Sequence, residues 1–418
     1  MGGFEGRYNR TITSMTITSK TIASRQNPRH DNKERRMPHR ARWVKALGSP
    51  RNDNKERCMP HEHRNVAPTI ANLPAFFSPI IEEQYGSAYA RLIEQGSDVR
   101  RATTLRANTL LSTREEVASI LDDAGIEYEC PAWYQDAFVL DPKDAQAVWE
   151  LPALEEGKIY LQSLSSMLPP LLMGPCSDLD ILDMCAAPGG KTTQLAALNN
   201  GRARITACEM NAPRAERLEY NLKRQGTRNV VVMRTDARRL DSFFSFDRIM
   251  LDAPCSGSGT LRASSAKTLK HFTPALIQKC TKSQSALLPK ALELLKPGGT
   301  MVYSTCSILK EENEEIVRSS LKKASKHGAY ELVPISLPGA TLAPATDMNL
   351  APATEATIAP ATDTTITPAR KATLASATNI DASPNVLPVL PTTLEGTLTL
   401  CPTKLFEGFF CAKIKRLA

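Results

Sequence analysis

The sequence predicts an α/β protein whose main domain is a mostly parallel sheet with helices on both faces. Two observations favour this class. From about residue 159 onward, short strand-like runs alternate with longer helix-like segments. Several of these runs also end in loops that contain acids, glycines or cysteines, and in an open α/β sheet ligands bind at the edge where the strands end. The sequence therefore predicts a ligand site at that edge.

The composition is that of a cytoplasmic protein with more than one domain. The chain has 418 residues, 42% of them hydrophobic, which is enough for a sizeable core. No apolar run approaches the roughly 20 residues of a membrane span, and the first 20 residues lack a secretory signal. The ten cysteines form no C-x-x-C pair, which argues against a zinc ribbon and against a disulfide scaffold. We expect no metal site and a reducing compartment.

Residues 1–66 are expected to form a basic, disordered tail. Residues 1–64 carry 15 lysines and arginines against 6 acids, and the peptide at 31–39 returns with one change at 53–61. The tail is either an arm that adds affinity for nucleic acid phosphates or an incidental extension. We interpret Cys58, His61 and His63 as parts of the duplicated peptide, not as metal ligands.

Residues 67–152 are predicted to form a small α/β domain. Thr113 and Glu116 have the spacing of a helix-capping box, Gly125 ends that helix, and residues 126–130 alternate as a strand does. This domain either grips the substrate or is purely structural.

The main domain is expected over residues 153–337, beginning with the run at 159–162. Its strands are predicted at residues 180–183, 204–209, 230–234, 248–252 and 300–305. The helix before the last of these is expected to span residues 283–296 and to end at a Lys-Pro-Gly-Gly stop signal.

The loop after the first of these strands has the composition of a cofactor-binding turn. Small residues and two glycines allow close approach of the backbone to a ligand at a helix start, and they run in the order Cys185, Ala186, Ala187, Pro188, Gly189, Gly190, Lys191. A P-loop is disfavoured because the first glycine of that motif falls at Cys185. Glu209 after the second strand could hold ribose hydroxyls, and Asp236 after the third could hold an adenine amino group. Together these acids suggest an adenosine site.

Two cysteines follow two further strands. Cys255 lies three residues after Asp252, and Cys306 follows the strand at 300–305. A buried cysteine is usually a small hydrophobe, but two at the ends of neighbouring strands favour a reactive thiol.

These motifs resemble the Nol/Nop/Sun family of RNA cytosine-5 methyltransferases, in its bacterial RsmB/Sun class. The resemblance rests on residues 104–109 and 162–166, the 185–191 turn, Asp252 to Cys255, residues 304–307, Glu312-Asn313-Glu314, and residues 406–413, which resemble the family's last strand. It implies a Rossmann-like fold with a seven-stranded sheet and S-adenosylmethionine as cofactor.

The resemblance also implies the residue roles. Residues Cys185 to Lys191 would wrap the methionine part of the cofactor, Glu209 would hold the ribose, and Asp236 would lie beside the adenine. Cys306 would add to C6 of cytosine, because C5 is a poor nucleophile until a thiolate has created an enamine. Asp252 would hydrogen-bond at N3 of the cytosine, and Lys191 would position Asp252 or the cofactor carboxylate. Cys255 would assist release of the methylated base from Cys306.

The sequence departs from the family at two places. Many members have Arg-x-x-Pro-Asp after the Pro-Cys stretch, whereas here Arg262 is followed by Ala-Ser-Ser, which leaves RNA contacts there open. Residues 338–395 are an insertion with an eight-residue repeat beginning at Ala343, and we expect a flexible loop before the last strand at 396–418.

The sequence thus predicts a monomeric RNA cytosine-C5 methyltransferase that acts on ribosomal RNA and binds neither membrane nor DNA. Two alternatives stay open, namely transfer RNA as the substrate and a non-catalytic RNA-binding assembly factor with the same fold. A P-loop-like NTPase is a third and weaker one.

Overall fold

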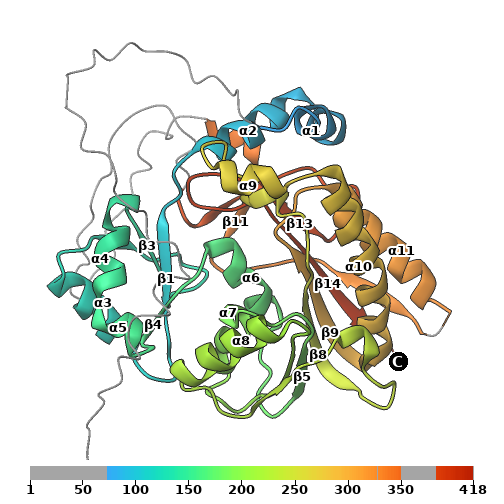
Figure 1. Cartoon of the computed structure of the whole chain (residues 1–418), viewed down its shortest axis with the longest axis horizontal. Coiled ribbons are helices and arrows are strands. Elements are labelled where there is room, and N and C mark those ends of the chain that lie inside the picture. Colours follow the sequence, from blue (N-terminus) through green and yellow to red (C-terminus); the bar gives the residue numbers. More distant parts are fainter. Residues whose placement is uncertain (1–72, 327, 350–382, 418) are drawn as a thin grey trace, which may run out of the picture. The chain divides into compact units, whose positions relative to one another are not determined.

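The computed structural model describes residues 73–326, 328–349 and 383–417, all of which belong to one unit spanning Ala67–Ala418 (Figure 1). The predicted basic tail, its duplicated peptide and most of the eight-residue repeat lie outside these residues. None of the described helices is both long and apolar enough to cross a bilayer.

The first part of the described chain is a helical hairpin followed by a small antiparallel sheet. The hairpin consists of α1 (Phe77–Tyr85) and α2 (Ser87–Asp98). The sheet has the order β2-β3-β1-β4, from β1 (Thr103–Ala107), β2 (Tyr128–Glu129), β3 (Ala137–Leu140) and β4 (Ile159–Leu161). Its helices are α3 (Arg114–Asp123), α4 (Ala145–Glu150) and α5 (Pro152–Glu155).

The expected start of α3 is confirmed, and the expected place of residues 159–161 is wrong. The Thr113 hydroxyl accepts a hydrogen bond from the Glu116 amide, as a capping box requires. Residues 159–161 form β4, which pairs with β1 in the small sheet and does not open the main one. The residue pattern of a three-residue apolar strand is compatible with either sheet. Only the tertiary structure decides which strand it pairs with.

The main sheet has ten strands, and seven of them form the expected Rossmann-like core. The parallel strands are ordered β9-β8-β5-β6-β7, from β5 (Asp180–Asp183), β6 (Arg204–Cys208), β7 (Val230–Met233), β8 (Phe246–Asp252) and β9 (Leu295–Thr305). Antiparallel β14 (Phe409–Arg416) pairs with β9 and with β10 (Tyr330–Val333).

Three further strands correct the expectation of a seven-stranded sheet. They are β11 (Thr341–Pro344), β12 (Val386–Val389) and β13 (Leu398–Leu400), which extend the sheet beyond β14. The first two come from the ends of the predicted flexible insertion, 338–395, and pair with each other in parallel. Apolar side chains at the C-terminal end of the insertion explain the difference, since Leu387 and Leu390 are buried there.

Helices cover both faces of the main sheet. Helices α6 (Leu164–Leu172), α7 (Gly190–Leu198) and α8 (Ala212–Arg224) pack on one face, and α10 (Pro274–Leu294) and α11 (Glu314–Ala324) lie on the other (Figure 1). The short α9 (Ala266–His271) precedes α10. Helix α10 starts earlier than expected, and the Lys-Pro-Gly-Gly signal lies inside β9.

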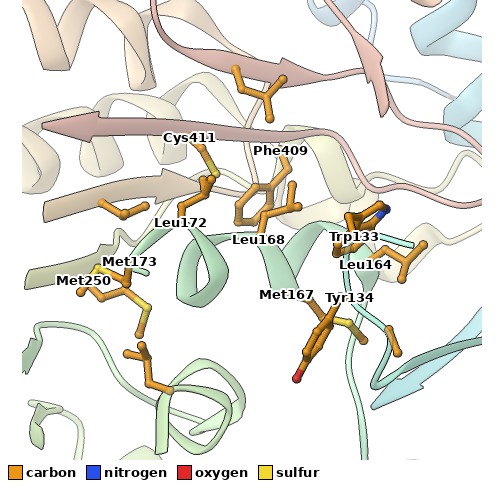
Figure 2. Packing of buried hydrophobic residues seen from close by; sticks show 14 of the residues in the cluster. Trp133, Tyr134, Leu164, Met167, Leu168, Leu172, Met173, Met250, Phe409 and Cys411 are labelled. Atoms are coloured by element: carbon orange, nitrogen blue, oxygen red, sulfur yellow. The ribbon is translucent and has the colours of Figure 1, made fainter. Parts of the chain in front are cut away.

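The largest buried cluster fixes α6 against the last strand. Leu168 and Leu172 of α6 lie beside Phe409 and Cys411 of β14 (Figure 2). Strand β8 is buried on both faces, with Ile249 on one face and Met250 on the other fully inaccessible, as expected for a covered parallel strand. This packing holds α6 and the ends of β8, β9 and β14 together, and the candidate site lies there.

Candidate active site

The loop between β5 and α7 is held in shape by α8. Gly189 has φ +109°, and a Cβ there would lie 3.0 Å from Leu218 Cδ1, so only glycine fits without strain. The Ala187 and Pro188 carbonyls accept hydrogen bonds from Arg214 and Asn221 of α8 at 2.8 and 2.7 Å. The predicted turn from Cys185 to Lys191 therefore lies at the N-terminus of α7, where backbone amides favour an anionic group.

Asp183 at the end of β5 is buried and incompletely paired. Its Oδ2 accepts from the Thr192 hydroxyl at 2.7 Å, whereas Oδ1 is buried without a hydrogen-bond partner. Burial raises the pKa of Asp183 to about 7. An orphaned carboxyl oxygen next to this loop fits a ligand that brings its own donors. The sequence predicted Asp183 only as the last residue of a strand.

The other two acids predicted for the cofactor lie at the ends of the next strands. Glu209 is buried, accepts from the Asn211 amide at 2.8 Å, and pairs with Arg214 at 3.2 Å. Asp236 follows β7 and forms a two-pronged ion pair with Arg238, whose hydrogen bond lowers the pKa of Asp236. Both carboxylates therefore lie at the carboxyl edge of the sheet.

Lys191 and Asp252 form an ion pair, as one of the two predicted alternatives for Lys191 requires. Lys191 Nζ lies 2.7 Å from Asp252 Oδ2 and 2.8 Å from Ser166 Oγ of α6. Burial lowers the pKa of Lys191, but the charge and hydrogen bond of Asp252 more than offset this and leave it raised. Asp252 Oδ1 accepts from Ser304 Oγ at 2.8 Å. The Asp252 carboxylate is thus fixed by Lys191 of α7 and Ser304 of β9, and Ser166 of α6 holds Lys191 in turn.

The two candidate cysteines meet. Cys255 Sγ lies 3.0 Å from Cys306 Sγ, although 51 residues separate them. Both side chains are half-buried. The hydrogen bond to Cys306, together with burial, raises the pKa of Cys255 well above its usual range. Cys255 is therefore held as a neutral thiol, and either sulfur can be the donor in this contact.

Two residues of the Glu-Asn-Glu motif, for which the sequence predicted no role, stabilise the loops that carry the two cysteines. Glu312, fully buried, accepts from the Ser256 amide at 2.8 Å and from its hydroxyl at 2.5 Å. Asn313 accepts from the Thr305 hydroxyl at 2.6 Å and donates to the Ser307 carbonyl at 2.9 Å. The only available signal was their place in the Glu-Asn-Glu motif.

The two loops are also tied to the segment before β14. The Gly259 amide donates to the Cys306 carbonyl at 3.0 Å, and the Gly408 amide donates to the Gly259 carbonyl at 2.9 Å. A Cβ on Gly259 would lie 2.0 Å from the Gly408 oxygen, so the close approach requires glycine. Within the described residues, no cluster of His, Cys, Asp or Glu could hold a metal ion.

Two sequence families match the chain. One, described as 16S rRNA methyltransferase RsmB/F, covers residues 170–368, and the other, an RsmF/B-like ferredoxin-like domain, covers residues 73–145. Ribosomal RNA small subunit methyltransferase F of Shewanella loihica is 36% identical over 220 residues, which is 51% of this chain and 45% of that protein. The 28S rRNA (cytosine-C(5))-methyltransferase of Mus musculus is 36% identical over 256 residues, which is 59% of this chain and 32% of that protein.

A solved structure matches most of the chain. A methyltransferase homolog protein from Pyrococcus horikoshii is 29% identical and superimposes with a TM-score of 0.60, covering 82% of this chain and 95% of that one. By contrast, the chain matches less than half the length of each curated relative named above.

Fold and site together define a Rossmann-like methyltransferase with an added ferredoxin-like domain. Within that class, the two family models that match residues 170–368 and 73–145, together with the rRNA methyltransferases named above, support the Nol/Nop/Sun family of RNA cytosine-5 methyltransferases.

Proposed function

We propose that this protein transfers a methyl group from S-adenosylmethionine to C5 of a cytosine in ribosomal RNA. The observation that carries the proposal is the contact of Cys306 with Cys255, beside the Lys191–Asp252 ion pair. In the proposed reaction one thiol attacks C6, the other assists release of the product and the carboxylate binds the base, whereas an assembly factor has no use for this arrangement. Ribosomal RNA is preferred over transfer RNA because the named relatives are rRNA methyltransferases.

Residues at the carboxyl edge of the sheet would hold the cofactor. The Cys185–Lys191 turn and the amides at the start of α7 would bind its methionine part, Glu209 the ribose and Asp236 the adenine. The orphaned Oδ1 of Asp183 fits a ligand with donor groups at this place. When bound, S-adenosylmethionine supplies an electrophilic methyl group on a sulfonium.

Cys306 makes C5 of the cytosine nucleophilic. The Cys306 thiolate adds to C6, so that an Sγ–C6 bond forms and the electrons of the C5=C6 bond become available at C5. Asp252 accepts hydrogen bonds from the cytosine amino group and from a protonated N3, which stabilises the form of the base that accepts the thiolate. Lys191 orients the Asp252 carboxylate through their ion pair.

Cys255 acts when the product is released. The C5 proton passes to water, the C5=C6 bond forms again, and Cys306 leaves as a thiolate. The neutral Cys255 thiol, 3.0 Å away, donates a hydrogen bond to that departing sulfur. Its raised pKa keeps the proton in place for this step.

The remaining expectations are part of the same proposal. The enzyme would act in the cytoplasm as a monomer, on RNA and not on DNA, and the cysteines among the described residues are free thiols, which is consistent with a reducing compartment. Target cytosines would be single-stranded or flipped out, because C6 must be reached from one face. The small domain over residues 67–152, extended by β4, would contact the RNA.

The test compares RNA from cells with and without this protein by bisulfite sequencing of ribosomal and transfer RNAs. We expect one rRNA cytosine to lose its methyl mark, and to regain it with the wild-type chain but not with Cys306→Ala. A lost tRNA mark would move the substrate to tRNA. If no cytosine changed, the assembly-factor alternative would replace the proposal.

A further inference from the structure

A cavity of about 250 Å³ lies between the two sheets, outside the set of residues assigned to the reaction. Its polar lining includes Arg101 before β1, Gln162 and Ser163 after β4, Arg262 after the Pro-Cys loop, and Glu407 before β14. Four segments that are far apart in the sequence therefore supply its walls.

The cavity is adjacent to the catalytic groups. Arg101 Nη2 donates to the Gly259 carbonyl at 3.3 Å, and the Gly259 amide donates to the Cys306 carbonyl. On the other side, Ser163 caps α6 and donates to Glu407 Oε2 at 2.7 Å, while Ser166, one helical turn on, accepts from Lys191. Residues three apart at the start of a helix are neighbours, so the cavity adjoins the groups that hold Lys191.

The charges in the cavity suit a nucleobase better than a phosphate. Arg101 Nε is buried without a hydrogen-bond partner, and burial lowers the pKa of Arg101 while Glu407 opposes that shift. The negative charge of the Glu407 carboxylate would repel a bare phosphate and weaken its binding. A guanidinium and a carboxylate together match guanine, which offers acceptors at O6 and N7 and donors at N1 and N2. Adenine, cytosine and uracil do not present both sets in this arrangement.

We propose that this cavity binds an unstacked guanine next to the target cytosine in the RNA chain. Arg101 donates to the acceptor edge of the guanine, Glu407 accepts from its N1–H and N2–H groups, and exposed Arg262 lies at the rim, where the backbone phosphate passes. The inference rests on the proposed function, because it assumes that the RNA enters with its cytosine at Cys306.

The test measures binding, so it does not depend on methyl transfer. The full chain is titrated into labelled uridine nonamers with one central cytosine, which has guanine, inosine or adenine on its 5′ or its 3′ side. We expect guanine on one side to strengthen binding about tenfold over adenine, as one good two-pronged base contact does. Inosine, which lacks the N2 amino group, should fall in between.

Two variants and a matched control assign the contacts. Glu407→Gln keeps an acceptor for Ser163, and Arg101→Met keeps the apolar stem of the side chain while removing the guanidinium; each should reduce the guanine preference to less than twofold. Arg100→Met should leave the guanine preference unchanged, because Arg100 is an exposed neighbour whose guanidinium donates to the Pro142 carbonyl and does not line the cavity. Thermal melting confirms that each variant is folded.

The outcomes separate this inference from the proposed function. Equal binding of guanine and adenine RNAs by the wild type would overturn the inference, as would a preference that survives both variants. A uniform loss of binding in Arg101→Met without a change in preference would indicate a phosphate contact and would also overturn it. Tritium transfer from S-adenosylmethionine to ribosomal RNA is measured separately, so a protein that prefers guanine but transfers no methyl group would refute only the function.

Discussion

Replacing Cys255 with alanine should trap the protein on its RNA. The variant removes the thiol whose Sγ lies 3.0 Å from Cys306 Sγ. A hydrogen bond to a charged group contributes about 1.5 to 3 kcal/mol. If the bond acts mainly on the departing Cys306 thiolate, its loss slows release about 10- to 100-fold, since each 1.4 kcal/mol is a factor of ten in rate. Formation of the Sγ–C6 bond should change much less.

The assay is a single-turnover reaction with S-adenosylmethionine and the target RNA, stopped in denaturant. We expect a protein–RNA band that resists denaturation to accumulate with Cys255→Ala and to be absent from Cys255→Ala/Cys306→Ala. Cys255→Ser, which keeps a donor, should release faster than alanine. Cys280→Ala, at a buried cysteine of α10, is the matched control and should behave as the wild type.

The reasoning would be refuted if Cys255→Ala released methylated RNA at the wild-type rate. It would equally fail if the covalent band formed without Cys306, because another nucleophile would then carry the reaction.

Three further predictions concern the groups that support the site. Glu312→Ala leaves the half-buried Ser256 amide and hydroxyl without their acceptor, so the free energy of unfolding in urea should fall by about 2 to 4 kcal/mol; exposed Glu315→Ala is the control and should change it little. Because the folded-state pKa of Asp183 is raised to about 7, the stability that its proton provides is full below about pH 4 and is lost as the pH rises through 7. Asp183→Asn should flatten the pH dependence of the unfolding free energy between pH 4 and 7, and an unchanged profile would contradict this. Gly259→Ala places a Cβ 2.0 Å from a backbone oxygen, so it should lower stability by about 3 kcal/mol or more and slow methyl transfer, as melting and single-turnover rates would show.

The sequence determined the local features of this protein. The cap at Thr113, the strand ends at Asp183 and Asp252, and the glycine turn before α7 were all readable because each depends on residues close together in the chain. The five parallel strands were found for the same reason, since each contains a short run of strand-forming residues.

The tertiary structure decided which distant residues meet. Pairing of β4 with β1, and the addition of β11 to β13 to the main sheet, depend on edges that no local pattern specifies. Glu312 reaches Ser256, and Arg101 reaches Gly259, only because separate segments are packed together, so neither spacing nor composition marks them. A polar residue in a short motif shows that a group is available, whereas its partner, and therefore its role, is fixed by the fold.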